Sequence, residues 1–255
     1  MSINVKHLTY KYPSGKNNVI NDLNLSIEAG TINVILGLNG CGKTTFIKLL
    51  AGLLKADNGE ILYSDKDVFN ISVKERSKIF SYVPQKTYSA DDFLVKDYLT
   101  YGFINSLKFY QTPSDEQLEK VNNIAERLRI THLLSQKMGQ ISGGERQIVS
   151  IASCLLQDTP IILLDEPTSA LDLKNQNNVL SLLREITTQG KTIILSSHNP
   201  NHALFLESNV VLMDKGKIIK QGPSNEIVNT NTLKEIYGDN ICLSEELTYK
   251  EISFR

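Results

Sequence analysis

The sequence has no excess of charge of either sign. It contains 27 basic and 28 acidic residues, for a formal net charge of -1. This balance argues against the broadly basic surface of a nucleic-acid-binding protein, so we expect no nucleic-acid partner. The hydrophobic content of 41% excludes a disordered chain and is typical of a globular protein. A chain of 255 residues is long enough to form one domain with a sizeable core.

Long apolar runs are also missing. No run approaches the roughly 20 residues that a helix needs to cross a bilayer. Residues 1–7 form a strand pattern interrupted by polar residues, which differs from a signal peptide. We therefore expect the chain to stay in the cytoplasm.

Cysteines are few, and their number is odd. Cys41, Cys154 and Cys242 have no metal-ligand spacing, so the sequence does not predict a disulfide framework or a cysteine metal site. Cys41 lies where a predicted helix begins, and the amides there would lower the pKa of its thiol. We interpret it as a small residue that fits the turn rather than as a redox switch.

The first third of the sequence has the pattern of strands followed by a helix. Apolar and polar residues alternate over residues 3–10 and 19–27, which predicts two strands separated by a turn at 13–15. Residues 32–36 have the pattern of a buried strand. Helical spacing then begins at Lys43 and continues through a set of apolar residues. These are Phe46, Leu49, Leu50 and Leu53.

The segment from about residue 87 to 140 is predicted to be a helical subdomain inserted into the core. Its clearest helix covers residues 114–128, where Ser114 and Gln117 offer a capping box. The apolar residues expected on one face of this helix are Leu118, Val121, Ile124, Ala125 and Leu128.

The remaining sequence alternates strands and helices. Strands are predicted over 161–164 and 192–196, a helix over 176–188, and a closing hairpin over 210–220. This alternation predicts an α/β fold with a mostly parallel sheet, to which the N-terminal strands add an antiparallel β subdomain. Residues 239–255 form a short tail to which we assign no role.

Residues 37–44 have the composition of a phosphate-binding loop. The glycines allow backbone amides to surround phosphate oxygens, and the helix that follows directs its positive end at the anion. Lys43 adds a charge at the β- and γ-phosphates, and the Thr44 hydroxyl can bind Mg²⁺. The expected nucleotide-binding residues of this loop and of the position after it are Gly37, Asn39, Gly40, Cys41, Gly42, Lys43, Thr44 and Thr45.

Two adjacent acids follow the predicted strand 161–164. Asp165 would lie at the carboxyl end of the sheet, where it can reach a Mg²⁺ ion. Glu166 is the candidate general base that polarises the attacking water. The alternative is that both acids cap a helix before Pro167.

Over residues 2–238 the sequence resembles the ABC ATPases, with the family's motifs in the usual order. Tyr12 matches the aromatic residue that stacks on adenine, and Gln85 matches the glutamine that reaches Mg²⁺ and the γ-phosphate. His198 matches the switch histidine that contacts the γ-phosphate. The remaining motifs are the signature loop, made of Ser142, Gly143, Gly144 and Glu145, and the loop 169–172 that crosses to the partner subunit.

The resemblance implies a P-loop NTPase (RecA-like) fold and the hydrolysis of ATP. It implies that residues 1–238 form one ABC ATPase domain and that Mg²⁺ is held by Thr44, Gln85 and Asp165. It also implies a head-to-tail homodimer in which each signature loop caps the ATP held by the other subunit. The catalytic residues would be Glu166, Gln85 and His198.

The sequence departs from the family pattern in the signature helix. Ile141 replaces the usual leucine, a change of similar volume. Ile148 stands where arginine is frequent, and Ser153 and Cys154 replace a common Arg-Ala pair. These changes remove positive charge, so they put the turnover rate in question.

The resemblance indicates the energy-coupling subunit of a membrane importer. We expect integral membrane permease subunits as partners, a solute-binding protein as an indirect partner, and a position on the inner face of the membrane. The permease would dock in a groove near residues 85–93. Residues 89–103 and 222–238 are most similar to subunits importing iron–siderophore, haem or cobalamin.

Other functions are compatible with the sequence. A soluble ABC ATPase acting on DNA, ribosomes or cluster assembly is one alternative, and a subunit for metal ions, vitamins or export is another. Too few residues lie between Lys43 and Asp165 for the long coiled coil of DNA-repair members. A phosphate-loop kinase or GTPase would lack the signature loop at 142–144.

Overall fold

A mixed six-stranded sheet forms the centre of the fold. The computed structural model describes residues 2–85, 90–105 and 112–238. The strand order is β10-β9-β3-β8-β7-β6, in which β9 to β6 run parallel and β10 pairs antiparallel with β9. The strands are β3 (Ile32–Leu36), β6 (Phe80–Val83), β7 (Ile161–Leu164), β8 (Thr192–Ser197), β9 (Asn209–Asp214) and β10 (Lys217–Pro223). The carboxyl ends of the parallel strands therefore meet at one edge, where α/β proteins bind their ligands.

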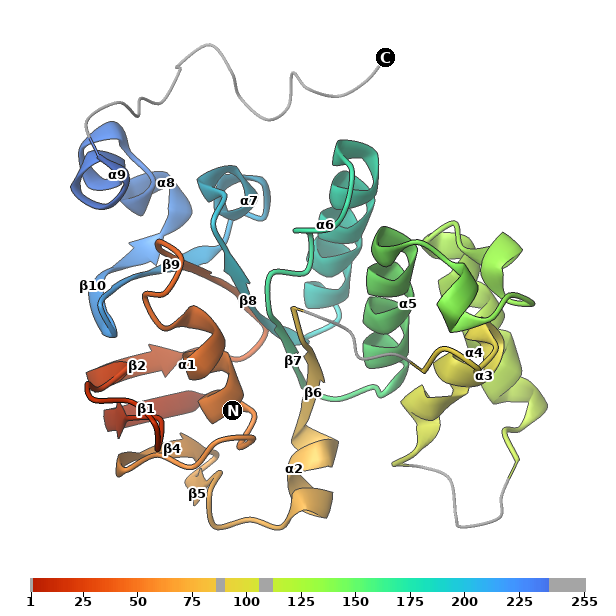
Figure 1. Cartoon of the computed structure of the whole chain (residues 1–255), viewed down its shortest axis with the longest axis horizontal. Helices are drawn as coiled ribbons and strands as arrows, with labels where there is room; N and C mark the ends of the chain where they lie inside the picture. The colour runs from red at the N-terminus through yellow and green to blue at the C-terminus, as the bar shows by residue number, and fades with distance from the viewer. Residues whose placement is uncertain (1, 86–89, 106–111, 239–255) are drawn as a thin grey trace.

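A second sheet is antiparallel and packs beside the first (Figure 1). Its order is β2-β1-β4-β5, with β1 (Ile3–Tyr10), β2 (Ile20–Ile27), β4 (Asn58–Tyr63) and β5 (Lys66–Asp67). Inward residues of β1 and β2 share an apolar cluster with helix α1 (Lys43–Leu50). This cluster fixes the start of α1, and with it the phosphate loop, against the N-terminal strands.

The central strands are apolar on both faces because helices or the second sheet cover each face. In β3, Ile32, Val34 and Leu36 point into one apolar cluster, whereas Ile35 points into the other. Strands β7 and β8 alternate in the same way. Because successive side chains of a strand point to opposite faces of the sheet, each of these strands contributes to both apolar clusters.

Further helices precede and follow the sheet strands. They are α2 (Val73–Ile79), α6 (Leu173–Thr187), α7 (Pro200–Phe205), α8 (Ser224–Ile227) and α9 (Thr230–Tyr237). In the described ranges, no helix is both long enough and apolar enough to cross a membrane.

A group of helices lies beyond the β6 edge of the sheet, on the right in Figure 1. It consists of α3 (Val95–Thr100), α4 (Asp115–Arg127), α5 (Gly143–Leu156) and 3-10 turns at Tyr101–Phe103, Thr131–Leu133 and Met138–Gln140. The capping box predicted at Ser114 and Gln117 is present at the start of α4. Val121, Ile124 and Ala125 are buried on the inner face of that helix.

The structure confirms the predicted fold class and corrects two packing assignments. Helix α1 ends at Leu50, so Leu53 leaves the helical face and is 58% exposed. Leu118 lies in the first turn of α4 and is 44% exposed, because the apolar stripe reaches the core only from Val121 onward. The tail 239–255 lies outside the described residues.

Candidate functional site

The loop after β3 holds a lysine that is folded back across it. Lys43 is 5% exposed, and its Nζ donates hydrogen bonds to the carbonyl oxygens of Gly37 (2.8 Å) and Leu38 (3.1 Å). A Cβ at Gly37 would lie 2.3 Å from the Met213 carbonyl oxygen and 2.7 Å from the Cys41 Sγ. Only glycine fits there, so the backbone can come this close to β9. The result is a narrow loop with a buried positive charge at the start of a helix.

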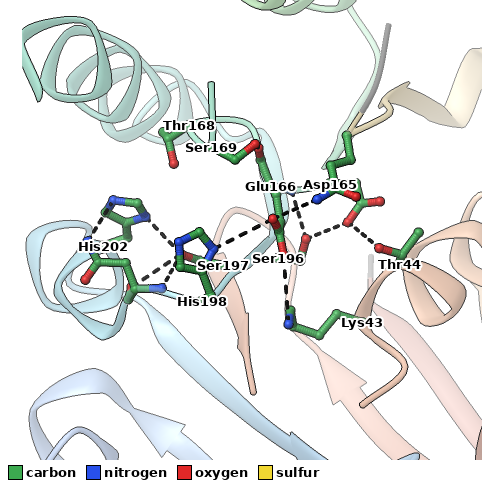
Figure 2. Close-up of polar contacts among 12 residues, drawn as sticks. Lys43, Thr44, Asp165, Glu166, Thr168, Ser169, Ser196, Ser197, His198 and His202 are labelled. Carbon is green, nitrogen blue, oxygen red and sulfur yellow. Dashed lines mark hydrogen bonds and ion pairs between the residues drawn. The ribbon is translucent and has the colours of Figure 1, made fainter. Parts of the chain in front are cut away.

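Asp165 is buried at the end of β7 and connects the phosphate loop to β8. Its Oδ1 accepts hydrogen bonds from the Thr44 Oγ1 (3.0 Å) and the Ser196 Oγ (2.7 Å), as Figure 2 shows. Within the described part of the chain, Oδ2 is buried without a hydrogen-bond partner. A buried carboxylate oxygen without a donor, beside a hydroxyl, offers the hard oxygen ligands that Mg²⁺ takes. Asp165 therefore does not cap a helix, and the pair fits a magnesium ion.

Glu166 has an unusual backbone conformation and several polar contacts. Its φ is +47°, a left-handed conformation that is uncommon for a residue with a side chain and that clusters at functional sites. The Ser196 hydroxyl accepts the hydrogen bond of its backbone N–H at 2.9 Å. The Gln85 Nε2 donates to its Oε2 at 2.9 Å. The His198 Nδ1 lies 3.7 Å from Oε2, and the Lys43 Nζ lies 4.0 Å from Oε1.

These contacts bring the three predicted catalytic residues together with Lys43, each from a different strand end. Lys43 follows β3, Gln85 follows β6, Glu166 follows β7 and His198 follows β8. The Glu166 side chain is 12% exposed, whereas that of His198 is 57% exposed. The Glu166 carboxylate is therefore nearly buried, whereas the His198 ring is accessible to a bound ligand.

Tyr12 lies against the phosphate-loop helix. Its hydroxyl shares a hydrogen bond with the Thr45 Oγ1 at 3.2 Å. Its ring meets the ring of Tyr10 edge to face, with centroids 5.0 Å apart. The aromatic residue predicted to contact adenine is thus fixed beside the loop predicted to contact phosphates.

The signature loop forms the start of α5 and is closed on itself. The Ser142 Oγ accepts from the Glu145 N–H (3.3 Å), and the Glu145 Oε2 accepts from the Ser142 N–H (2.7 Å). These bonds lower the pKa of the Glu145 carboxyl. Ser142 and Gly143 are exposed, and a Cβ at Gly144 would lie 2.9 Å from the Ala170 carbonyl oxygen. Across the described ranges, no hydrogen bond or ion pair joins the signature loop to Lys43, Thr44 or Glu166.

Cys41 contradicts our expectation of a lowered thiol pKa. The residue is 5% exposed, and burial raises its pKa more than Lys43 and the backbone hydrogen bonds lower it. Burial also raises the pKa of the Cys154 thiol to about 12. Both thiols are therefore poor nucleophiles, and Cys242 lies outside the described residues.

The residues of α5 that depart from the family pattern are buried where a charge would be unfavourable. Ile148 is 4% exposed and Cys154 is 3% exposed, both within the apolar cluster on the helical side of the sheet. A Cβ at Gly102 would lie 2.7 Å from the Ser153 carbonyl oxygen, so the 3-10 turn after α3 packs closely on α5. Ile141 is also buried, as expected for a residue that replaces leucine.

Two residues near the site were not identified from the sequence. Ser196 binds both Asp165 and the backbone of Glu166. The available signal was a hydroxyl residue at the end of the apolar strand that precedes His198. The second residue is His202, which is buried with 3% exposure.

Comparisons with known proteins identify the family of this chain. Residues 20–169 match the ABC transporter family. An ATP-binding protein of Helicobacter pylori strain 26695, assigned to iron chelatin transport, is 34% identical over 239 residues, covering 93% of each chain. The iron(3+)-hydroxamate import ATP-binding protein FhuC of Bacillus subtilis is 31% identical, covering 86% of this chain and 82% of the relative.

A solved structure of a dimeric bacterial ABC transporter cassette superposes with a TM-score of 0.80. It is 25% identical, and the match covers 87% of this chain and 98% of the cassette. The chain belongs to the ABC transporter family, as an ATP-binding subunit that hydrolyses ATP.

Proposed function

We propose that two copies of this chain close head to tail around two ATP molecules and drive a separate membrane permease. The observation that carries the proposal is that one chain holds only part of an ATP site. The phosphate loop and the acids come together, whereas Ser142 and Gly143 remain exposed at the start of another helix. A second copy can supply this helix N-terminus to the γ-phosphate. The dimeric cassette among the similar structures supports this arrangement.

In the proposed ATP site, the loop amides and Lys43 bind the phosphates. Bound phosphate oxygens would replace the loop carbonyls as partners of the Lys43 ammonium, which lies at the start of α1. The backbone of Asn39, Gly40 and Cys41 surrounds the phosphates, the Thr45 hydroxyl contacts them, and the Tyr12 ring stacks on adenine.

The magnesium ion, when bound, neutralises charge on the β- and γ-phosphates. We assign it to the Thr44 hydroxyl and to the Asp165 Oδ2, which lacks a partner in the described structure. Gln85 would add its side-chain carbonyl oxygen, because its amide nitrogen already donates to Glu166. A ligand set with one carboxylate suits a Mg²⁺ ion that is also held by substrate oxygens.

We assign Glu166 as the general base that accepts a proton from the attacking water. Gln85 fixes one of its oxygens, and the Ser196 hydroxyl fixes its backbone. The exposed His198, close to the same carboxylate, would contact the γ-phosphate and thereby report that ATP is present. Gln85, Glu166 and His198 each follow a different strand, so the sheet fixes their relative positions.

The relatives favour an iron chelate as the transported cargo. The two similar ATP-binding proteins are named for iron chelatin transport and for iron(3+)-hydroxamate import. We therefore propose iron–siderophore uptake, with haem or cobalamin as the related alternatives. Residues 1–238 would act as one ATPase domain on the inner face of the membrane, with residues 87–140 as its helical subdomain. A solute-binding protein would take part indirectly.

The permease would dock near residues 85–93, of which 86–89 lie outside the described residues. Tagged protein purified from native membranes, followed by mass spectrometry, tests this proposal. We expect a polytopic permease, and we expect deletion of the gene for this chain to abolish the uptake of ⁵⁵Fe-labelled hydroxamate siderophores. Recovery only with ribosomal or DNA-processing proteins would replace the transport assignment with a soluble ABC ATPase. A permease partner with normal iron uptake would instead indicate a metal-ion, vitamin or export subunit.

A further inference from the structure

His202 is a buried histidine whose two ring nitrogens both contact the loop that carries His198. It lies in the first turn of α7 and is 3% exposed. Its Nδ1 lies 2.9 Å from the Ser197 Oγ, and its Nε2 lies 3.3 Å from the Asn199 Nδ2. In Figure 2 the ring of His202 lies to the left of the ring of His198, on the side away from Glu166.

The hydrogen bonds of Asn199 determine which nitrogen of His202 carries the proton. The Asn199 Oδ1 accepts the N–H of Asn201 and so caps α7, which directs the Asn199 amide nitrogen toward His202. Because an amide nitrogen only donates, the His202 Nε2 must accept and Nδ1 must carry the proton. The Nδ1–H then donates to the Ser197 Oγ.

The Ser197 hydroxyl completes this arrangement. It accepts from the backbone N–H of Asn199 at 3.0 Å and donates to the Asn199 carbonyl oxygen at 3.3 Å. Together with the bond from His202, the hydroxyl uses its one donor and two acceptor positions. The residues on both sides of His198 are therefore held by the same imidazole.

The position of His202 is itself fixed by the core. Ala203, the next residue, is fully buried, and α7 packs against β3 and α8. Burial, together with the nearby His198, lowers the pKa of His202 to about 4. The ring is thus neutral near pH 7, as the acceptor role of Nε2 requires.

We infer that His202 is a positioning residue that holds the loop at 197–199 so that His198 faces Glu166. The inference rests on the proposed role of His198 in the ATPase reaction. An exposed histidine on a free loop would adopt many orientations, and only some of them place Nδ1 toward the carboxylate. His202 restricts these orientations without contacting ATP.

Kinetics of four variants test this inference. His202→Leu keeps the volume but removes both hydrogen bonds, whereas His202→Gln keeps one donor and one acceptor. We expect His202→Leu to lower kcat about tenfold with the KM for ATP changed less than about twofold. We expect His202→Gln to restore most of the loss. His198→Ala alone and His198→Ala/His202→Leu complete a double-mutant cycle, in which the second substitution should have no further effect on kcat.

The outcomes separate this inference from the proposed role of His198. Normal turnover in His198→Ala would refute the proposed role and the inference together. Two results would overturn the inference alone. One is impaired turnover in His198→Ala together with normal turnover in His202→Leu. The other is a further loss of turnover in the double variant. If His202→Leu does not fold, ¹⁵N NMR of the histidine rings in the unmodified protein decides. A neutral His202 protonated at Nδ1 supports the inference, and protonation at Nε2 overturns it.

Discussion

Ser196 offers a sharp test of how the site is held together. Its side chain is fully buried at the end of β8, where it donates to the Asp165 Oδ1 and accepts from the Glu166 N–H. Ser196→Ala removes one oxygen atom and both bonds. The substitution leaves an unpaired N–H on a residue that is already in a left-handed conformation.

The magnitude follows from the two bonds. A hydrogen bond to a charged group contributes about 1.5–3 kcal/mol, and an unsatisfied buried donor costs about 1–3 kcal/mol. Thr44 still donates to Asp165, so we take the lower part of the range and expect a loss of about 3 kcal/mol. In a protein of this size, that corresponds to a fall in Tm of roughly 6–12 °C.

Equilibrium urea unfolding measures the effect directly, with Ser208→Ala as the matched control. Ser208 is also buried, with 3% exposure, and among the described residues its hydroxyl makes one hydrogen bond, to the Ala203 carbonyl oxygen at 3.2 Å. Its loss should be about 1 kcal/mol, and its ATPase activity should be normal. Ser196→Ala should in addition lower kcat, because Glu166 loses its backbone support. Equal stability losses in the two variants, with normal turnover in both, would refute the structural role of Ser196.

Three further predictions concern the loop, the signature helix and pH. Gly37→Ala places a Cβ 2.3 Å from the Met213 carbonyl oxygen, so the affinity for ATP should fall at least about 100-fold. Calorimetry measures this affinity, and a wild-type value would contradict the loop geometry. Ile148→Arg buries a charge and should reduce the free energy of unfolding in urea by about 4 kcal/mol, whereas Leu118→Arg, at a 44% exposed position, should change it by less than about 1 kcal/mol. Burial lowers the pKa of His202 from 6.5 to about 4, so the unfolded chain binds the proton first as the pH falls. The neutral His202 therefore contributes stability that is fully present above pH 6.5 and is lost as the pH falls from 6.5 to 4. That loss should be about 3 kcal/mol, and His202→Gln should lack this part of the pH dependence in urea titrations at pH 7.5 and 4.5.

Most of the fold could be predicted from the period of its apolar residues. Residues 32–36 and 161–164 are short apolar runs with turn signals after them, and both are buried strands. The small strands β4 and β5 and the helix α2 had no such signal. Helix α2 buries none of its residues, so its capping box stabilises it without an apolar stripe.

The site could be predicted where a local motif carries the chemistry, but not where a residue acts through another. Lys43, Asp165 and Glu166 stand in motifs, and the structure brings them together. Ser196 and His202 lie in ordinary contexts. The contacts of Ser196 depend on how β8 aligns with β7, and those of His202 depend on how α7 folds back onto the end of β8. The pKa of Cys41 could not be predicted either, because burial outweighs the charge and amides that the motif suggests.

The central claim, that Glu166 is the base of a site shared by two chains, is tested most directly with Glu166→Gln. The measurement is the molar mass in solution with and without ATP and Mg²⁺, together with the rate of phosphate release. We predict normal ATP binding, hydrolysis reduced by about 10²–10⁴, and a stable dimer that forms only with ATP. A variant that hydrolyses ATP at nearly the normal rate, or that binds ATP and remains a monomer, would contradict the account.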